Sequence, residues 1–209
     1  MHKVAILTGD VVDSTKLLPT KRGELARLLR ETLGNVSGNG VYDIYRGDSF
    51  QVQIPDPVQS LRTSIQIRCK LRQAFVQEKK PVIDARISIG IGSVTYQASR
   101  VSESDGEAYQ LSGRTLDAMK ESRLQIKTGD EAFNGWIDAI CLLLDVIISG
   151  WTAQQSEVIY ELLNGERQQD IAKRIGITQA SVNDRLRTAH WHALEATVVF
   201  FEEKIKKIL

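Results

Sequence analysis

The segment from residue 168 to 187 constrains the fold of this chain more than any other part of the sequence. Ile171 would bury one face of a short helix, and Ala172 is small enough for a second helix to cross close above it. Gly176 suits the turn that follows, because a positive φ costs little without a Cβ. Val182 then fills the corner between the helices. This spacing predicts a tight helix-turn-helix unit.

The second helix of this unit would present polar side chains on its outward face. Gln and Asn side chains can bind adenine edges in the major groove, and Arg can bind guanine or phosphate. The pattern therefore indicates double-stranded DNA as a partner. The candidate DNA-binding residues are Lys173, Arg174, Thr178, Gln179, Ala180, Ser181, Asn183, Asp184, Arg185 and Arg187.

A different use of the same helices stays open, because the charge of this region is balanced. Residues 151–209 carry eight Lys or Arg and eight Asp or Glu, so net charge does not favour DNA over a protein partner. A three-helix bundle that contacts another protein is the alternative. The tail from His190 to Leu209 has apolar residues at helical spacing, which suits dimerisation or packing on the rest of the chain.

The region before residue 131 alternates between strand and helix patterns. Apolar–polar alternation on both sides of Gly47-Asp48 predicts a hairpin. The order of elements is β-α-β-β-α-β, the plan of ferredoxin-like folds. The expected fold is therefore α+β, with a second, all-α helix-turn-helix domain. Predicted strands cover residues 4–7, 41–45, 49–54, 85–92 and 124–127, predicted helices cover 25–33 and 61–75, and residues 106–119 are predicted to be a loop that enters a helix.

Two helices carry patterns whose surroundings are less obvious. The basic residues Arg62, Arg68, Lys70 and Arg72 are expected to form a solvated face of their helix. The apolar segment 136–148 carries two Asp residues and falls short of a membrane span. The apolar side chains of this segment cover nearly all sides of the expected helix. It is therefore expected to be packed on both sides, against the sheet domain or a second subunit.

Bulk composition is that of an ordinary globular protein. The chain has 209 residues, 25% of them charged, and a formal net charge of +1. Its two cysteines lie in apolar helical patterns and suggest reduced core thiols. No signal peptide is evident at the start. We therefore expect a cytoplasmic protein with no membrane contact.

Two loop carboxylates suggest a cation site. In a ferredoxin-like sheet the first strand can lie beside the hairpin, which would bring Asp10 close to Asp48. Two carboxylates and the carbonyl of Val11 are ligands of the kind that Mg²⁺ uses with a nucleotide. Ser14, Thr15 and the amides of the next helix start could hold phosphate groups.

These elements resemble those of class III nucleotide cyclases. Thr8-Gly9-Asp10-Val11-Val12-Asp13-Ser14-Thr15 is similar to their metal and phosphate loop, Gly47-Asp48-Ser49-Phe50 to their hairpin, and residues 106–114 to their Gly-x-x-Val-Asn-x-Ala-x-Arg signature. With the helix-turn-helix, the whole chain resembles the SatD family. The resemblance implies Mg²⁺ or Mn²⁺ on Asp10 and Asp48, and a nucleotide ligand at Val11, Ser14, Thr15, Gly47, Gln110 and Arg114.

Departures from the cyclase pattern favour binding over catalysis. Gln110 replaces an Asn and is one methylene longer, which would shift a transition-state contact. Ile44 stands where the cyclases select adenine with Lys, and Asp13 adds a negative charge to the phosphate loop. We expect a transcriptional regulator that is a homodimer. Its predicted parts are a cyclase-like sensor domain (1–130), a connecting helix (131–150) and a helix-turn-helix domain (151–209). An active cyclase and a ligand-free architectural dimer remain alternatives.

Overall fold

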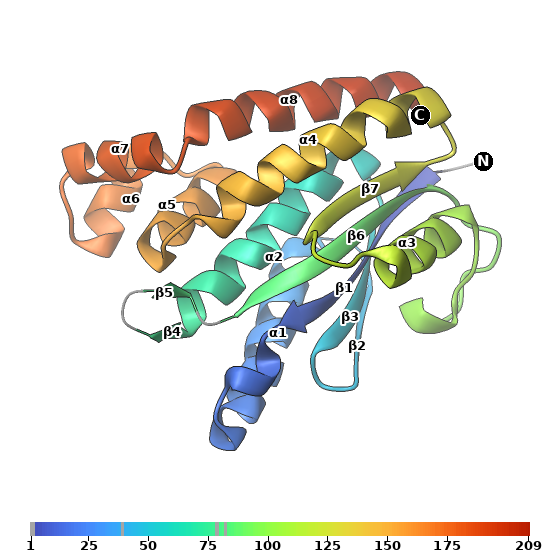
Figure 1. Ribbon diagram of the computed structural model, residues 1–209, viewed down its shortest axis with the longest axis horizontal. Coiled ribbons are helices and arrows are strands. Elements are labelled where there is room, and N and C mark those ends of the chain that lie inside the picture. The colour runs from blue at the N-terminus through green and yellow to red at the C-terminus, as the bar shows by residue number, and fades with distance from the viewer. Residues whose placement is uncertain (1–2, 39, 78–79, 82) are drawn as a thin grey trace.

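The computed structural model describes residues 3–38, 40–77, 80–81 and 83–209. Figure 1 shows a twisted sheet with helices on both faces and a helical region at one end. The strands are β1 (Lys3–Val12), β2 (Tyr42–Tyr45), β3 (Ser49–Ile54), β4 (Val76–Gln77), β5 (Lys80–Pro81), β6 (Asp84–Ser93) and β7 (Leu124–Thr128). The helices are α1 (Arg22–Val36), α2 (Ser60–Ala74), α3 (Glu107–Ala118), α4 (Glu131–Ser149), α5 (Ala153–Leu163), α6 (Gln168–Ile175), α7 (Gln179–Thr188) and α8 (Trp191–Ile208).

The main sheet has the strand order β2-β3-β1-β6-β7. Strand β1 pairs antiparallel with both β3 and β6. The elements β1-α1-β2-β3-α2-β6 thus follow the predicted β-α-β-β-α-β plan. Helix α3 then leads to β7, which joins the edge of the sheet parallel to β6. The predicted α+β class is confirmed.

The two faces of the sheet are covered by different helices. Ala5 and Leu7 of β1 belong to the core shared with α1 and α2, whereas Val4 and Ile6 belong to a small core that contains Ala108 of α3. Helix α3 lies very close to the sheet, because a Cβ at Gly90 would come within 2.2 Å of the Ala108 carbonyl oxygen. A glycine is therefore required beneath this helix.

One hydrophobic core runs from the sheet into the C-terminal helices. Buried residues of β1, α2 and α4 share this core with buried residues of α5 to α8. Helix α4 coincides with the predicted connecting helix to within one residue. Trp151 follows it directly, and its indole Nε1 donates to the Ala189 carbonyl oxygen over 2.9 Å. The sheet and the C-terminal helices are thus packed against each other without a gap.

An ionic seam lies between α2, β6 and α4. Arg68 is fully buried and donates two hydrogen bonds to Asp84 and one to Asp145. Arg72 binds Asp84 and also donates to the carbonyl oxygens of Ser149 and Trp151, at the end of α4. The prediction of a solvated basic face on α2 is therefore wrong for these two arginines. We call Arg68, Arg72, Asp84, Arg123 and Asp145 the ionic seam.

Helix α4 is the one helix of the described part of the chain that is long and apolar enough to cross a membrane, judged by length and composition alone. The sequence-based expectation concerned only residues 136–148, which Asp138 and Asp145 interrupt, whereas the helix runs from Glu131 to Ser149. The two aspartates within the helix, however, bind protein partners: Asp138 accepts from Lys127 and Asp145 accepts from Arg68. Core helices of folded proteins pass the same test, and α4 packs against β7.

Candidate functional site

The helix-turn-helix unit has the geometry that its small and apolar residues predict. Ile171, Ala172 and Val182 are buried between the helices. Gly176 ends α6 with a φ of 71°, and the next amide, that of Ile177, donates to the Ala172 carbonyl oxygen over 3.0 Å. This left-handed cap is cheap only for glycine. Helices α6 and α7 lie at one end of the molecule, beyond the end of α4 (Figure 1).

Helix α7 starts with a side-chain cap. The Thr178 hydroxyl accepts from the Ser181 amide over 3.1 Å, and the two hydroxyls lie 2.9 Å apart. Such a cap satisfies an amide that would otherwise have no partner at the start of the helix. Thr178 and Ser181 therefore fix where α7 begins, and their hydroxyls are already engaged within the protein.

The outward face of α7 is exposed to solvent. Gln179, Ala180 and Asn183 on this face are all exposed. Asp184 and Arg187 are also exposed and form a loose ion pair with a 3.3 Å separation. An exposed pair of this kind is weak, so Arg187 can exchange this partner for another at little cost. We call Gln179, Ala180, Asn183, Asp184 and Arg187 the α7 face.

The other three basic candidates differ in how they are held. Lys173 is exposed on α6. Arg174 instead pairs with Glu161 of α5 over 2.8 Å, and Arg185 pairs with Glu157 of α5 over 3.4 Å. These two arginines tie α6 and α7 to α5. Their predicted role at phosphate groups is untested, and using them there would require breaking these pairs.

Asp10 is held by an arginine. Its carboxylate accepts from Arg86 Nη2 over 2.6 Å and from Arg86 Nε over 3.2 Å, and the same guanidinium donates to the Met119 carbonyl oxygen. Asp10 and Arg86 are direct cross-strand partners in the β1–β6 register. Sequence analysis overlooked Arg86, although pairing the two strands in antiparallel register would have placed it opposite Asp10.

Asp48 lies at the hairpin tip with different partners. Its side chain accepts from the Ser14 hydroxyl over 2.9 Å, and its carbonyl oxygen accepts from the Val11 amide over 3.0 Å. The structure thus brings the backbone of Asp10 and Val11 beside the hairpin, as predicted. The two carboxylates, however, bind different side chains.

A hollow of about 250 Å³ opens beside Asp48 and contains two arginines that sequence analysis did not select. Arg22 stands at the start of α1 and Arg46 at the hairpin tip, and neither forms an ion pair within the described part of the chain. Both have the geometry to bind phosphate oxygens. The lining residues are Ser14, Thr15, Arg22, Leu25, Ala26, Arg46, Gly47 and Asp48. We call this hollow the hairpin pocket.

The carboxylate pair does not fit a divalent cation as arranged. A guanidinium occupies both oxygens of Asp10. Among the described residues, moreover, no group of three His, Cys, Asp or Glu side chains could hold a metal ion. Mg²⁺ would need both the loss of the Arg86 pair and further oxygen ligands. No metal-dependent step is therefore derived for this site.

Gln110 and Arg114 lie elsewhere, on α3. Both are exposed, and the Gln110 amide nitrogen lies 3.3 Å from an Asp105 carboxylate oxygen. Neither residue lines the hairpin pocket. Within one subunit, therefore, these two predicted ligand residues are not part of the hollow that contains Ser14, Thr15 and Gly47.

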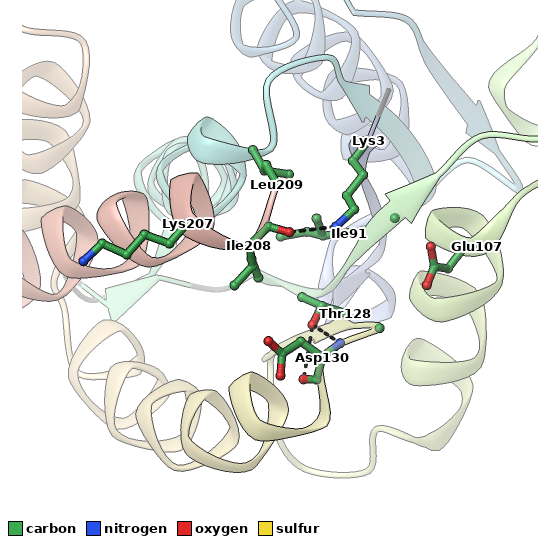
Figure 2. A pocket seen from close by; sticks show the side chains of 10 residues that line it. Lys3, Ile91, Glu107, Thr128, Asp130, Lys207, Ile208 and Leu209 are labelled. Atoms are coloured by element: carbon green, nitrogen blue, oxygen red, sulfur yellow. Dashed lines mark hydrogen bonds between the residues drawn. The ribbon is translucent and has the colours of Figure 1, made fainter. Parts of the chain in front are cut away.

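A larger hollow, of about 490 Å³, lies at the opposite end of β1 (Figure 2). Lys3 there donates to the Ile208 carbonyl oxygen over 2.7 Å. Glu107 and Asp130 also face this hollow, and Asp130 caps α4 by accepting from the Phe133 amide. Its acidic residues stand at helix starts, where they stabilise the helices. None of the predicted site residues lines it.

Comparison with known proteins finds only partial structural alignments. No protein-family model and no curated protein matches the chain. A solved bacterial light-regulated adenylyl cyclase aligns with 59% of this chain and 74% of its own, at 15% identity and a TM-score of 0.40. A second structure of a bacterial light-regulated adenylyl cyclase aligns with 60% of this chain but only 42% of its own, at 18% identity and the same TM-score.

Proposed function

We propose that this chain is a DNA-binding regulator of the SatD type, whose helix-turn-helix contacts double-stranded DNA and whose sheet region binds a phosphorylated ligand. The observation that supports this proposal most is the α7 face. Gln179, Asn183 and Arg187 project from a rigidly capped helix into solvent. A helix of a protein-contact bundle would also expose polar residues, so the DNA-selection experiment below decides between the two functions.

Selection from a random double-stranded DNA library tests the first half of this proposal. The wild-type protein should enrich a defined motif, and its affinity should fall steeply as salt concentration rises. Asn183→Ala should relax the preference at one base position. Arg30→Ala, which removes an exposed arginine from α1, serves as the control and should leave the motif unchanged. Failure of the library to yield any motif would contradict DNA recognition and favour a protein-contact bundle.

The hairpin pocket supports the second half. Arg22 and Arg46 supply two guanidinium groups, and Ser14 and Thr15 supply hydroxyls. Because Arg86 already neutralises Asp10, we expect the ligand to be an anion, such as a nucleotide, that binds through its phosphates without a divalent cation. This arrangement supports binding in preference to cyclase chemistry.

Isothermal titration with ATP, GTP and pyrophosphate tests this part, in EDTA and in Mg²⁺. At least one of these should bind in EDTA, and Arg46→Ala should abolish the heat while Arg30→Ala should not. Binding that requires Mg²⁺ and survives Arg46→Ala would contradict the pocket assignment. Release of pyrophosphate from ATP or GTP would instead indicate an active cyclase, and the absence of any binding would indicate a ligand-free dimer.

A further inference from the structure

Helix α4 turns an apolar face toward solvent. Leu142 is 57% exposed, Leu143 is 67% exposed and Val146 is 76% exposed. These residues share a face of α4 with the exposed Ala139. Single exposed apolar residues are ordinary, but a continuous row of them along a helix indicates a surface that another molecule covers.

The charged residues of α4 show that this orientation is fixed. Between residues 132 and 149 the only charged residues are Asp138 and Asp145. Asp138 binds Lys127 of β7 over 2.6 Å, while Asp145 accepts from Arg68 and from the Arg123 amide. Helix α4 is thus apolar on two sides: one apolar side is buried in the core, and a second, with Leu142, Leu143 and Val146, faces outward, whereas an ordinary surface helix has a polar outer face. Rotating α4 to bury its leucines would break the ionic seam.

The apolar surface continues onto α8, which lies beside α4 (Figure 1). Phe200 is 41% exposed and its ring packs edge-on against Trp136 of α4, with centroids 5.5 Å apart. Val199 next to it is 45% exposed. From these fractions, Leu142, Leu143, Val146, Val199 and Phe200 together expose on the order of 500 Å². A stable interface buries about 800 Å² on each partner, so these residues would supply most of one side. We call these five residues the α4–α8 patch.

We propose that this patch is a homodimer interface, in which α4 packs antiparallel to the α4 of a second copy across a two-fold axis near Ala139. The outward face of α4 carries small residues in its first half, Ala132 and Gly135, and larger side chains in its second half, Leu143 and Val146. In an antiparallel two-fold arrangement, the first half of α4 in one subunit packs against the second half of α4 in the other subunit. Gly135 then meets Leu143 of the partner subunit, Ala132 meets Val146 of the partner subunit, and Ala139 meets its own copy.

The chemistry of the surroundings favours a second copy over a lipid surface. Helices that lie on anionic membranes carry Lys and Arg along their polar edge. Helix α4 carries neither. The lysines of α8 lie only in its last turns, and Lys204 there already stands over the Phe200 ring, 5.1 Å from its centroid. The matching of small and large halves also suits a protein partner of defined shape, whereas lipid requires no such match. Cyclase domains dimerise head to tail, and a dimer of that kind would place Arg114, on the exposed face of α3, against the partner subunit. The interface proposed here is a different one, because it uses α4 and α8.

Sedimentation equilibrium of the full chain without DNA or nucleotide tests the proposal. The wild type should be dimeric at micromolar concentration. Leu143→Glu should raise the dimer dissociation constant at least about 100-fold, because it places a charge against Gly135 of the partner subunit. Leu18→Glu is the matched control, since Leu18 is 68% exposed on another surface, and it should remain dimeric. A monomeric wild type, or a dimer that Leu143→Glu leaves intact, would overturn the proposal.

Cross-linking locates the axis independently. Ala139→Cys should form a disulfide-linked dimer under mild oxidation, because the two-fold brings residue 139 beside its own copy at a distance that a disulfide can bridge. Ala74→Cys, at an exposed position on α2, should not. The native Cys69 and Cys141 are buried, and burial raises the pKa of both thiols, so they give no background. Cross-linking by Arg114→Cys in place of Ala139→Cys would show the head-to-tail dimer, and wild-type monomers that bind phosphatidylserine vesicles would show a membrane surface. Neither outcome depends on whether the chain binds DNA.

Discussion

The ionic seam and the α7 face are built from similar residue types but behave in opposite ways. In the seam, Arg68 and Asp84 are buried and bind each other. On the α7 face, Arg187 and Asp184 stand in solvent 3.3 Å apart. An Arg–Asp pair holds secondary-structure elements together in the seam, whereas on the α7 face an Arg–Asp pair stays accessible to a binding partner. The two pairs differ in their burial, and burial cannot be predicted from the identity of either residue alone.

The seam also shows how an excess of positive charge is accommodated inside a protein. Three guanidinium groups face two carboxylates there. Arg72 makes up the difference by donating to the carbonyl oxygens of Ser149 and Trp151. Carbonyl groups at a helix end carry partial negative charge, so the end of α4 serves as an additional acceptor. On the α7 face no such compensation is needed, because water solvates the charges.

The largest expected effect comes from removing the carboxylate of Asp84, which pairs with all three arginines of the ionic seam. Asp84→Ala should lower the free energy of unfolding by about 3–5 kcal/mol, because it leaves buried guanidinium groups without their partner. Urea denaturation measures the effect. Asp117→Ala, at an exposed position of α3, is the control and should change stability by less than about 0.5 kcal/mol. A loss below about 1 kcal/mol at Asp84 would show that the seam does not hold the molecule together.

On the α7 face the expected effect is on binding and not on stability. Asn183→Ala should weaken binding to the selected DNA by about 1–3 kcal/mol, with the unfolding midpoint unchanged, because the side chain is exposed. Fluorescence anisotropy and urea denaturation on the same samples separate the two effects. If Asn183→Ala lowered the stability of the protein but not its affinity for DNA, the α7 face would be a structural element and not a binding surface.

The seam should also respond to acid. Burial alone would raise the pKa of Asp84, but Arg68 and Arg72 outweigh it and lower that pKa to about 2. A lowered carboxyl pKa contributes stability above the unfolded value near 4, and this stability is lost as the pH falls from about 4 to 2. We expect a loss of about 2 kcal/mol over this interval, measured by urea denaturation at each pH. In Asp84→Asn this part of the acid-dependent loss of stability should be missing. If the pH dependence of the unfolding free energy were the same as in the wild type, Asp84 would not be the group that titrates.

The smallest expected effect concerns Asp10 and Arg86, whose side chains are 27% and 29% exposed. Because solvent screens this pair, Asp10→Asn should cost less than about 1 kcal/mol. Millimolar Mg²⁺ should leave the thermal midpoint of the wild type unchanged. Stabilisation by Mg²⁺ that is lost in Asp10→Asn would show that a cation displaces Arg86.

The sequence predicted those features that depend on residues close together in the chain. The turn at Gly176 and the buried positions of Ile171 and Val182 lie within one short segment, so local sterics determine them. The succession of strands and helices along the chain was also predicted, because the alternation of apolar residues marks each strand. The division into two domains stays a prediction, since one core runs through both parts.

The features that sequence analysis missed depend on contacts between distant residues. Arg68 lies on an amphipathic helix and is typical of a surface residue until Asp84 and Asp145 are placed around it. Arg86 appears as an ordinary strand residue until its antiparallel register with Asp10 is known. The DNA-contact, nucleotide-contact and metal-ligand roles assigned from sequence remain untested as functions.

Only Gly150, Trp151 and Thr152 separate α4 from α5. The carbonyl oxygen of Trp151 binds Arg72, and its indole binds the carbonyl oxygen of Ala189, just before α8. This junction cannot act as a hinge, since any swing of α7 would have to pull a tryptophan out of the core. On the proposed function, a ligand in the hairpin pocket would therefore affect the α7 face by moving the whole subunit relative to a second copy, and not by bending this junction. A chimeric protein that joins the region before residue 150 to another domain would need to keep Trp151 together with Arg72, which donates to its carbonyl oxygen, and Ala189, whose carbonyl oxygen accepts from its indole.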